Sequence, residues 1–355
     1  MLDSADDAQP ATIYSLAEHQ VVHELDNQCE EFDQVHFVNN DTEALVVCRD
    51  EALSYLLKLV GDTPEIKPLE VLKHISGYGI QELKASSNGK YIIATQTEFG
   101  GDKIFLSSLD ASADFTEIEL DISEWNHKLF LDHHDLVAAV VLNGRQIYLI
   151  DLVSQTLKNK FVQPSYIYNL VFDNNGELFY TLNSDKTVIA YDAESGEQRF
   201  ELNTNEDISQ LMYSAAVNKL LTISTEDTLS IWEASSGVLV ERGTKKLGSN
   251  FRLTDDGLYL LSDGTNMQVY DLEKRNVIFE PDDFSYHLVW FYPEDDSFVV
   301  VANSGIKVIP AFTTNIEEQA IKRLHPLRRC LTDIERQNFY LPVLDEEEKR
   351  ARGCL

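Results

Sequence analysis

A polar turn, an apolar strand and a closing aromatic–acid pair follow one another in Ser184-Asp185-Lys186-Thr187-Val188-Ile189-Ala190-Tyr191-Asp192. Other strand-like runs along the chain also end in an acid, and with Asp192 these acids are Asp110, Asp151, Glu233 and Asp271. Successive acids lie 41, 41, 41 and 38 residues apart. Such even spacing indicates a structural repeat of about forty residues.

Each repeat is predicted to contain four short strands. Asn, Asp or Gly separates the first strand from the second, as in Ser87-Asn88-Gly89 and Asp255-Asp256-Gly257, and these residues accept the positive φ of tight turns. The second strand is continuously apolar, as in Phe298-Val299-Val300-Val301, which suits a strand covered on both faces. The acid ends the third strand, and a more polar fourth strand follows it. Four antiparallel strands in about forty residues are typical of a β-propeller blade.

The pattern predicts an all-β fold, a seven-bladed β-propeller of four-stranded antiparallel blades. Its first strands are expected to begin near Gln34, Gln81, His127, Ile167, Ile208, Asn250 and His287. The seventh repeat lacks a clear fourth strand, and residues 20–25 resemble an unattached one, so an N-terminal strand is predicted to close the ring. Residues 13–16 also resemble a third strand, which leaves an eight-bladed ring with a partial blade as an alternative.

The repeats are predicted to occupy residues 12–321, after an acidic N-terminus at residues 1–11 that is expected to be disordered. Residues 322–355 are predicted to form a separate tail. The tail opens with the basic segment Lys322-Arg323-Leu324-His325-Pro326-Leu327-Arg328-Arg329. This segment is expected to lie against the acidic propeller, with docking of an acidic partner as the alternative. Thr332-Asp333-Ile334-Glu335 is a capping-box pattern that predicts a short helix.

Charge excludes several classes of partner. The 355 residues include 29 Lys and Arg against 60 Asp and Glu, which gives a net charge of −31. Nucleic acids and anionic membranes need a basic face on the protein, so neither is an expected partner. The chain shows no apolar run long enough for a transmembrane helix, and its acidic start lacks the apolar core of a secretory signal.

The pattern of cysteines is used to predict the cellular compartment of the protein. Cys29, Cys48, Cys330 and Cys354 are scattered and form no CxxC pair. In a chain without a secretory signal they are read as reduced thiols, and a cytoplasmic location is predicted. Cys48 lies in an apolar run and is expected to belong to the core.

No catalytic, cofactor-binding or metal-ligating residue is predicted, and no cofactor. The most metal-like run is Asp132-His133-His134-Asp135, but neighbours on one short turn cannot all face the same ion, so it is interpreted as a turn. The aspartates that end the third strands are expected to be structural, because such an acid can accept hydrogen bonds from the turn that follows.

Aromatic residues recur where the first strands begin. They are Phe32, Tyr78, Trp125, Tyr166 and Tyr286. If their positions in the repeat are equivalent, they lie on one circle around the channel mouth. Large rigid side chains there suit a partner-binding site, and packing between blades is the alternative.

The repeats resemble those of WD-repeat proteins over about residues 12–321. The stretch from Ser184 to Asp192 matches that family's polar turn, strand and aromatic–acid pair, and Trp232-Glu233 occupies the same position in the next repeat. The Gly-His pair that opens the family's repeats is absent from every unit. The chain is therefore also similar to divergent propellers of YVTN or quinoprotein-like type.

The tail is similar to a segment that follows WD-repeat propellers in bacterial multidomain proteins. The matching residues are Arg329-Cys330-Leu331-Thr332, Glu335-Arg336, Phe339-Tyr340-Leu341-Pro342 and Gly353-Cys354. In those proteins the propeller is fused to STAND-type NTPase, caspase-like or kinase domains. This chain has no Walker-A pattern, so the resemblance implies a propeller that acts without such a domain.

The leading functional hypothesis is a non-enzymatic scaffold or sensor propeller. It would bind one or more proteins in a multiprotein assembly, in bacterial signalling or defence, with its oligomeric state left open. The first alternative is a propeller enzyme of hydrolase or lactonase type with a metal in the central channel. The second alternative is a sensor that binds a small molecule in that channel.

Overall fold

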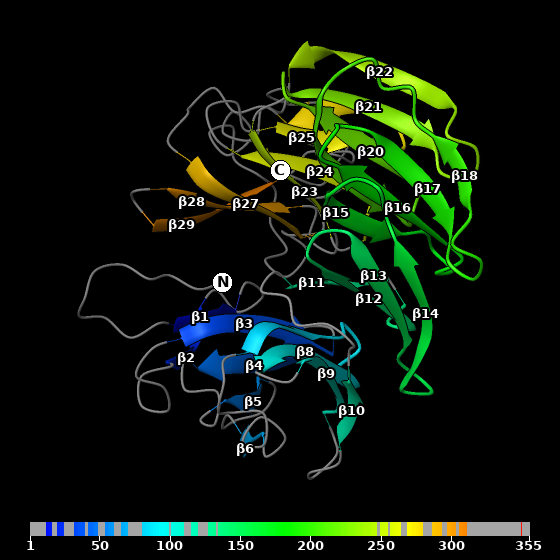
Figure 1. The fold of residues 1–355 in the computed structure, drawn as a ribbon. Helices are drawn as coiled ribbons and strands as arrows, with labels where there is room; N and C mark the ends of the chain where they lie inside the picture. Colours follow the sequence, from blue (N-terminus) through cyan, green and yellow to red (C-terminus); the bar gives the residue numbers. More distant parts are fainter. Residues whose placement is uncertain are drawn as a thin grey trace. The chain divides into compact units, whose positions relative to one another are not determined.

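The computed structural model describes residues 12–15, 20–24, 32–39, 42–48, 54–59, 65–69, 80–98, 101–109, 115–119, 127–132, 134–246, 249–254, 256–263, 268–279, 286–292, 297–302, 305–310 and 349. These residues form β-strands and short turns, and the strands are numbered β1 to β29 (Figure 1). They belong to two compact units, one ending at Lys246 and the other beginning at Leu247. Each unit is described by itself.

The described part of the first unit contains one hairpin and five four-stranded sheets. The hairpin pairs β1 (Thr12–Ser15) with β2 (Gln20–Glu24). The first sheet contains β3 (Phe32–Val38), β4 (Glu43–Cys48), β5 (Tyr55–Lys58) and β6 (Glu65–Pro68). The second contains β7 (Ile80–Ala85), β8 (Tyr91–Glu98), β9 (Gly101–Ser108) and β10 (Phe115–Glu119).

The remaining sheets of the first unit have the same order. The third contains β11 (His127–Leu131), β12 (Val137–Leu142), β13 (Gln146–Asp151) and β14 (Thr156–Val162). The fourth contains β15 (Ile167–Phe172), β16 (Leu178–Asn183), β17 (Val188–Asp192) and β18 (Gln198–Glu201). The fifth contains β19 (Ile208–Ser214), β20 (Lys219–Ser224), β21 (Thr228–Glu233) and β22 (Leu239–Lys246).

The second unit continues the pattern. Its four-stranded sheet contains β23 (Ser249–Leu253), β24 (Tyr259–Asp263), β25 (Gln268–Asp271) and β26 (Asn276–Phe279). Its three-stranded sheet contains β27 (Tyr286–Tyr292), β28 (Ser297–Ala302) and β29 (Gly305–Pro310). In both units every strand is antiparallel to the strand that follows it in its sheet.

This architecture confirms the all-β prediction and the repeat of four-stranded antiparallel sheets. The seven first strands begin at or within two residues of the predicted positions, at β3, β7, β11, β15, β19, β23 and β27. The repeated sheets are consistent with a propeller-like fold. The strand near residues 20–25 exists as β2, and its described pairing is with β1, so closure of a ring by this strand stays a prediction.

The second strands are buried on both faces because the sheets of the first unit stack on one another. All six residues of β12 are buried. Val137, Ala139 and Val141 from β12 pack in one cluster with Phe172 and Phe179 of the next sheet. The first strands also follow one another in contact, from β3 through β7, β11 and β15 to β19. The apolar runs seen in the sequence therefore form the core between neighbouring sheets.

Aromatic side chains complete these interfaces. Tyr191 stacks on Phe179 with ring centroids 5.3 Å apart. Trp232 is buried, and its indole N–H donates to the Thr222 hydroxyl at 2.8 Å. Both residues lie in clusters that join two sheets. The predicted tail and the acidic N-terminus fall almost wholly outside the described residues.

Candidate functional site

Polar residues that end the first strands organise the turns to the second strands. The Asp132 carboxylate accepts the backbone N–H groups of Leu136 at 2.6 Å and Val137 at 2.7 Å. Asp173 and Thr254 accept turn amides in the same way. Asp132 therefore holds its own turn, which confirms the turn interpretation of residues 132–135. Within the described part of the chain no group of three or more His, Cys, Asp and Glu could hold a metal ion.

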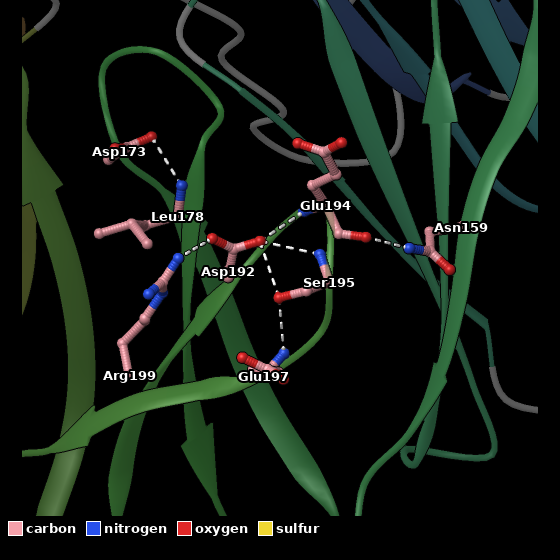
Figure 2. Close-up of polar contacts among 8 residues, drawn as sticks. All are labelled: Asn159, Asp173, Leu178, Asp192, Glu194, Ser195, Glu197 and Arg199. Carbon is pink, nitrogen blue, oxygen red and sulfur yellow. Dashed lines mark hydrogen bonds and ion pairs between the residues drawn. The ribbon is translucent and has the colours of Figure 1, made fainter.

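The acids that end the third strands accept hydrogen bonds in the turns that lead to the fourth strands. Figure 2 shows this for Asp192. Its Oδ1 accepts the N–H groups of Glu194 at 3.0 Å and Ser195 at 2.8 Å, and its Oδ2 pairs with Arg199. The hydrogen bond from the Ser195 N–H, followed by the one from Arg199, lowers the pKa of Asp192. Asp151 and Asp271 accept turn amides in the same way. These three acids are structural, as expected, and Asp110 lies outside the described residues.

Of the five aromatic residues proposed as a partner site, Tyr166 is the one whose side chain the structure describes. Its ring lies against Gly144, in the β12–β13 turn of the preceding sheet. A Cβ atom on Gly144, whose φ is +63°, would be 2.1 Å from that ring. The Tyr166 carbonyl accepts the N–H of Ser184 at 2.7 Å. Tyr166 therefore packs between two neighbouring sheets and is half-buried.

The strand register does not give the five aromatics one equivalent position. Phe32 pairs with the last residue of β4, and Tyr286 pairs with the last residue of β28. The residue with the same pairing in the fourth sheet is Ile167, which is completely buried and follows Tyr166. Phe32 and Tyr286 thus lie one position later than Tyr166. Tyr78 and Trp125 fall outside the described residues, and a binding role for the set stays a prediction.

Six described first strands have a shift in register after their first paired residue, and in five of them it is a β-bulge of a single residue, while the shift in β23 is wider. The pairing skips one residue in β3, β7, β15, β19 and β27. The skipped residues are Asp33, Gln81, Tyr168, Ser209 and His287. Bulges redirect side chains and are frequent beside functional sites. Sequence periodicity does not reveal an extra residue of this kind, which is why this position was missed.

Tyr168 is the exposed aromatic of this set, with 47% of its surface accessible. Its ring contacts Tyr166, with centroids 5.7 Å apart. The ammonium group of Lys186, from the β16–β17 turn, lies 5.9 Å from the ring centroid. The ammonium group of Lys128, from β11 of the preceding sheet, donates to the Tyr168 carbonyl at 3.0 Å. Two sheets thus each place a lysine against Tyr168, one near its ring and the other at its carbonyl oxygen.

A hollow of about 470 Å³ adjoins this group and includes Lys186 in its wall. Residues 185–187 and 201–207 line it, so it lies between the β16–β17 turn and the β18–β19 connection. Its acids are Asp185, Glu201, Glu206 and Asp207. Arg242 approaches Glu206 at 3.6 Å and donates to the Thr204 carbonyl at 2.7 Å. This margin of the sheets is called the tyrosine edge. It consists of the β12–β13, β16–β17 and β20–β21 turns and of residues 163–168 and 202–207.

Polar side chains at equivalent positions connect successive first strands. Each is the second residue of its first strand to pair with the second strand, and they are Glu82, Lys128 and Asn169. The Glu82 carboxylate accepts the Leu129 N–H at 2.7 Å. Lys128 donates to Tyr168, and the Asn169 amide donates to the Leu211 carbonyl at 2.8 Å. We refer to these three contacts as the first-strand bridges.

The structure corrects the interpretation of the cysteines. Cys48, the cysteine within the described residues, is buried in β4 as predicted, but it belongs to a disulfide. Its partner lies outside the described residues. A disulfide is unusual in a reducing compartment, so the cysteines no longer support the predicted cytoplasmic location. Among the described residues, no helix has the length and apolar character needed to cross a bilayer.

Comparison with known proteins leaves the fold as the main guide to function. No model of a known protein family matches the chain, and no curated protein is significantly similar to it.

Proposed function

We propose that the chain is a seven-bladed β-propeller of divergent WD-repeat or YVTN type that acts as a non-enzymatic scaffold or sensor. It binds one or more proteins in a multiprotein assembly, in bacterial signalling or defence. The seven successive antiparallel sheets support this fold, and the hairpin β1–β2 supplies strands that could complete the ring. Rigid stacked sheets with many turns along one margin suit protein binding.

The exposed ring of Tyr168 is the observation that carries the proposal. Large aromatic side chains fixed on a rigid frame are typical of protein-binding hot spots. Tyr168 lies at a bulge in the first strand of its sheet, next to Tyr166, and Lys186 beside its ring lines a hollow. The acids that resemble catalytic or metal-binding groups, Asp132 and Asp192, are occupied by turn amides.

Affinity capture from the native host tests this proposal, with Tyr168→Ala as the variant. Val153→Ala is the matched control, because Val153 is 64% exposed and lies in the β13–β14 turn, away from the tyrosine edge. We expect the wild type and the control to retain the same stoichiometric partner and Tyr168→Ala to lose it. Equal capture by all three proteins would place the partner elsewhere. Stoichiometric calcium or zinc in the purified protein would favour the metal-dependent enzyme instead.

A further inference from the structure

We propose that Lys128, Tyr168 and Lys186 form a docking point for a short acidic segment of a partner protein. This inference rests on the proposed function and specifies the chemistry of the partner at the tyrosine edge. The three residues come from β11, the bulge of β15 and the β16–β17 turn. They therefore combine an aromatic surface with two positive charges.

The Lys128 ammonium group interacts electrostatically with the Glu82 carboxyl, but within the described residues no acid makes direct contact with either lysine. Within the described residues Lys128 bonds a carbonyl oxygen and Lys186 lies over a ring, and neither forms an ion pair. The chain holds about twice as many acids as bases, so two lysines that contact one exposed tyrosine without an ion pair in the described residues stand out. Lysines left without a counter-charge are available to an anion on another molecule.

The acid closest in sequence to Lys186 is already engaged. The Asp185 carboxylate accepts the hydroxyl groups of Thr187 at 2.6 Å and Ser165 at 2.9 Å. The bond from Thr187 is the main cause of the lowered pKa of Asp185. Asp185 is thus tied to its own turn, and this arrangement leaves the Lys186 ammonium group to solvent and the tyrosine ring.

The docking point is held in place before any partner arrives. Lys186 has a φ of +68° and its N–H donates to the Asn183 carbonyl at 2.9 Å, which fixes the turn that carries it. Tyr166 is packed on Gly144 and supports the Tyr168 ring. Binding to preorganised groups loses little conformational entropy.

Charge complementarity selects the occupant. Two ammonium groups favour carboxylate side chains, and the Tyr168 ring offers surface to their aliphatic parts. The neighbouring hollow carries Glu201, Glu206 and Asp207, which would repel a long polyanion. A net charge of −31 disfavours nucleic acid for the same reason. The best fit is therefore a short acidic stretch of polypeptide.

The test uses the full-length protein and a labelled peptide of alternating glutamate and leucine, measured by fluorescence anisotropy. The same peptide with glutamine in place of glutamate is the matched ligand. We expect the wild type to bind the glutamate peptide at least about tenfold more tightly, with the difference shrinking as salt rises. Lys186→Gln should weaken binding of the glutamate peptide by about tenfold and leave the melting temperature unchanged, since the Lys186 side chain has no hydrogen-bond partner among the described residues.

Lys160→Gln is the matched control variant. The Lys160 ammonium group lies 4.7 Å from the Tyr148 ring centroid, but that tyrosine is buried and lies on β13. This variant should bind the glutamate peptide as the wild type does. Equal weakening by both variants would show a general charge effect and overturn the docking point.

Other outcomes also decide the matter. Equal affinity of the wild type for the two peptides would overturn the acidic preference, and tight binding of an RNA homopolymer would assign the lysines to nucleic acid. If the captured host partner is lost with Tyr168→Ala but kept with Lys186→Gln, the proposed function stands and the acidic docking point fails. If both variants keep the partner, both proposals fail at this edge.

Discussion

Tyr166 and Tyr168 lie close together but differ in how much of each side chain is buried. Tyr166 packs on Gly144 of the preceding sheet, whereas Tyr168 is 47% exposed. We expect Tyr166→Ala to lower the free energy of unfolding by about 2 kcal/mol, because a half-buried ring and its contacts are lost. Tyr168→Ala should change it by about 0.5 kcal/mol or less. Denaturant unfolding of both variants measures this, and a larger loss for Tyr168→Ala would contradict the assignment.

The pKa of Glu82 is shifted in the opposite direction to the pKa values of the turn residues Asp151 and Asp192. Burial raises its pKa above the ordinary value of 4.5, against the opposing effects of Lys84 and the Leu129 N–H. Because the pKa of Glu82 is higher in the folded state, this group adds most to the free energy of unfolding at pH values below its unfolded pKa. That stabilisation is lost as pH rises through the folded pKa. Glu82→Gln should therefore be at least as stable as the wild type near neutral pH.

Urea unfolding of Glu82→Gln and wild type between acidic and neutral pH measures this difference. The glutamine keeps an oxygen that can accept the Leu129 N–H, so the change mainly removes the buried charge. The variant's advantage should shrink as pH falls toward 4.5. A variant that loses stability mainly at neutral pH would show that the ionised carboxylate strengthens the bridge.

The turns between third and fourth strands depend on single aspartates. In Asp192→Ala, the N–H groups of Glu194 and Ser195 lose their acceptor, and we expect a loss of about 1–2 kcal/mol. The lowered pKa of Asp192 means that its contribution is present above the unfolded value near 3.8 and is lost as pH falls through the folded value. The stability gap between the two proteins should therefore close under acidic conditions. A gap that persists there would indicate a packing effect.

The sequence predicted elements better than it predicted positions within them. The seven first strands follow from the period of the acids, and the role of Asp151, Asp192 and Asp271 follows from the need of a turn for an acceptor. The bulge at Tyr168 could not be predicted, because one extra residue leaves the spacing of the repeats nearly unchanged. For the same reason Phe32 and Tyr286 were aligned with Tyr166 instead of Ile167.

The site depends on contacts between repeats, which spacing does not encode. Lys128 is brought to Tyr168 by the stacking of two sheets, and Lys186 by the pairing of strands within the fourth sheet. A lysine in a first strand and a lysine in a turn carry no signal of their own in the sequence. The disulfide at Cys48 was missed because the four cysteines are scattered and form no CxxC pair that would indicate a pairing.

The proposed ring makes a prediction for the whole molecule. If strands from the N-terminus complete the last blade, removing residues 1–26 should leave an open sheet edge and promote aggregation. Size-exclusion chromatography and thermal unfolding of the truncated protein measure this. A truncated protein that remains monomeric with the same melting temperature would show that these residues do not close the ring.

The first-strand bridges link three pairs of successive sheets. At one joint Glu82 accepts a hydrogen bond from the next strand, whereas at the following joints Lys128 and Asn169 donate one. All three partners are backbone groups, so each bridge reaches the next strand whatever side chains that strand carries. The side chains of a neighbouring repeat can therefore change without loss of the hydrogen bond that links the two strands.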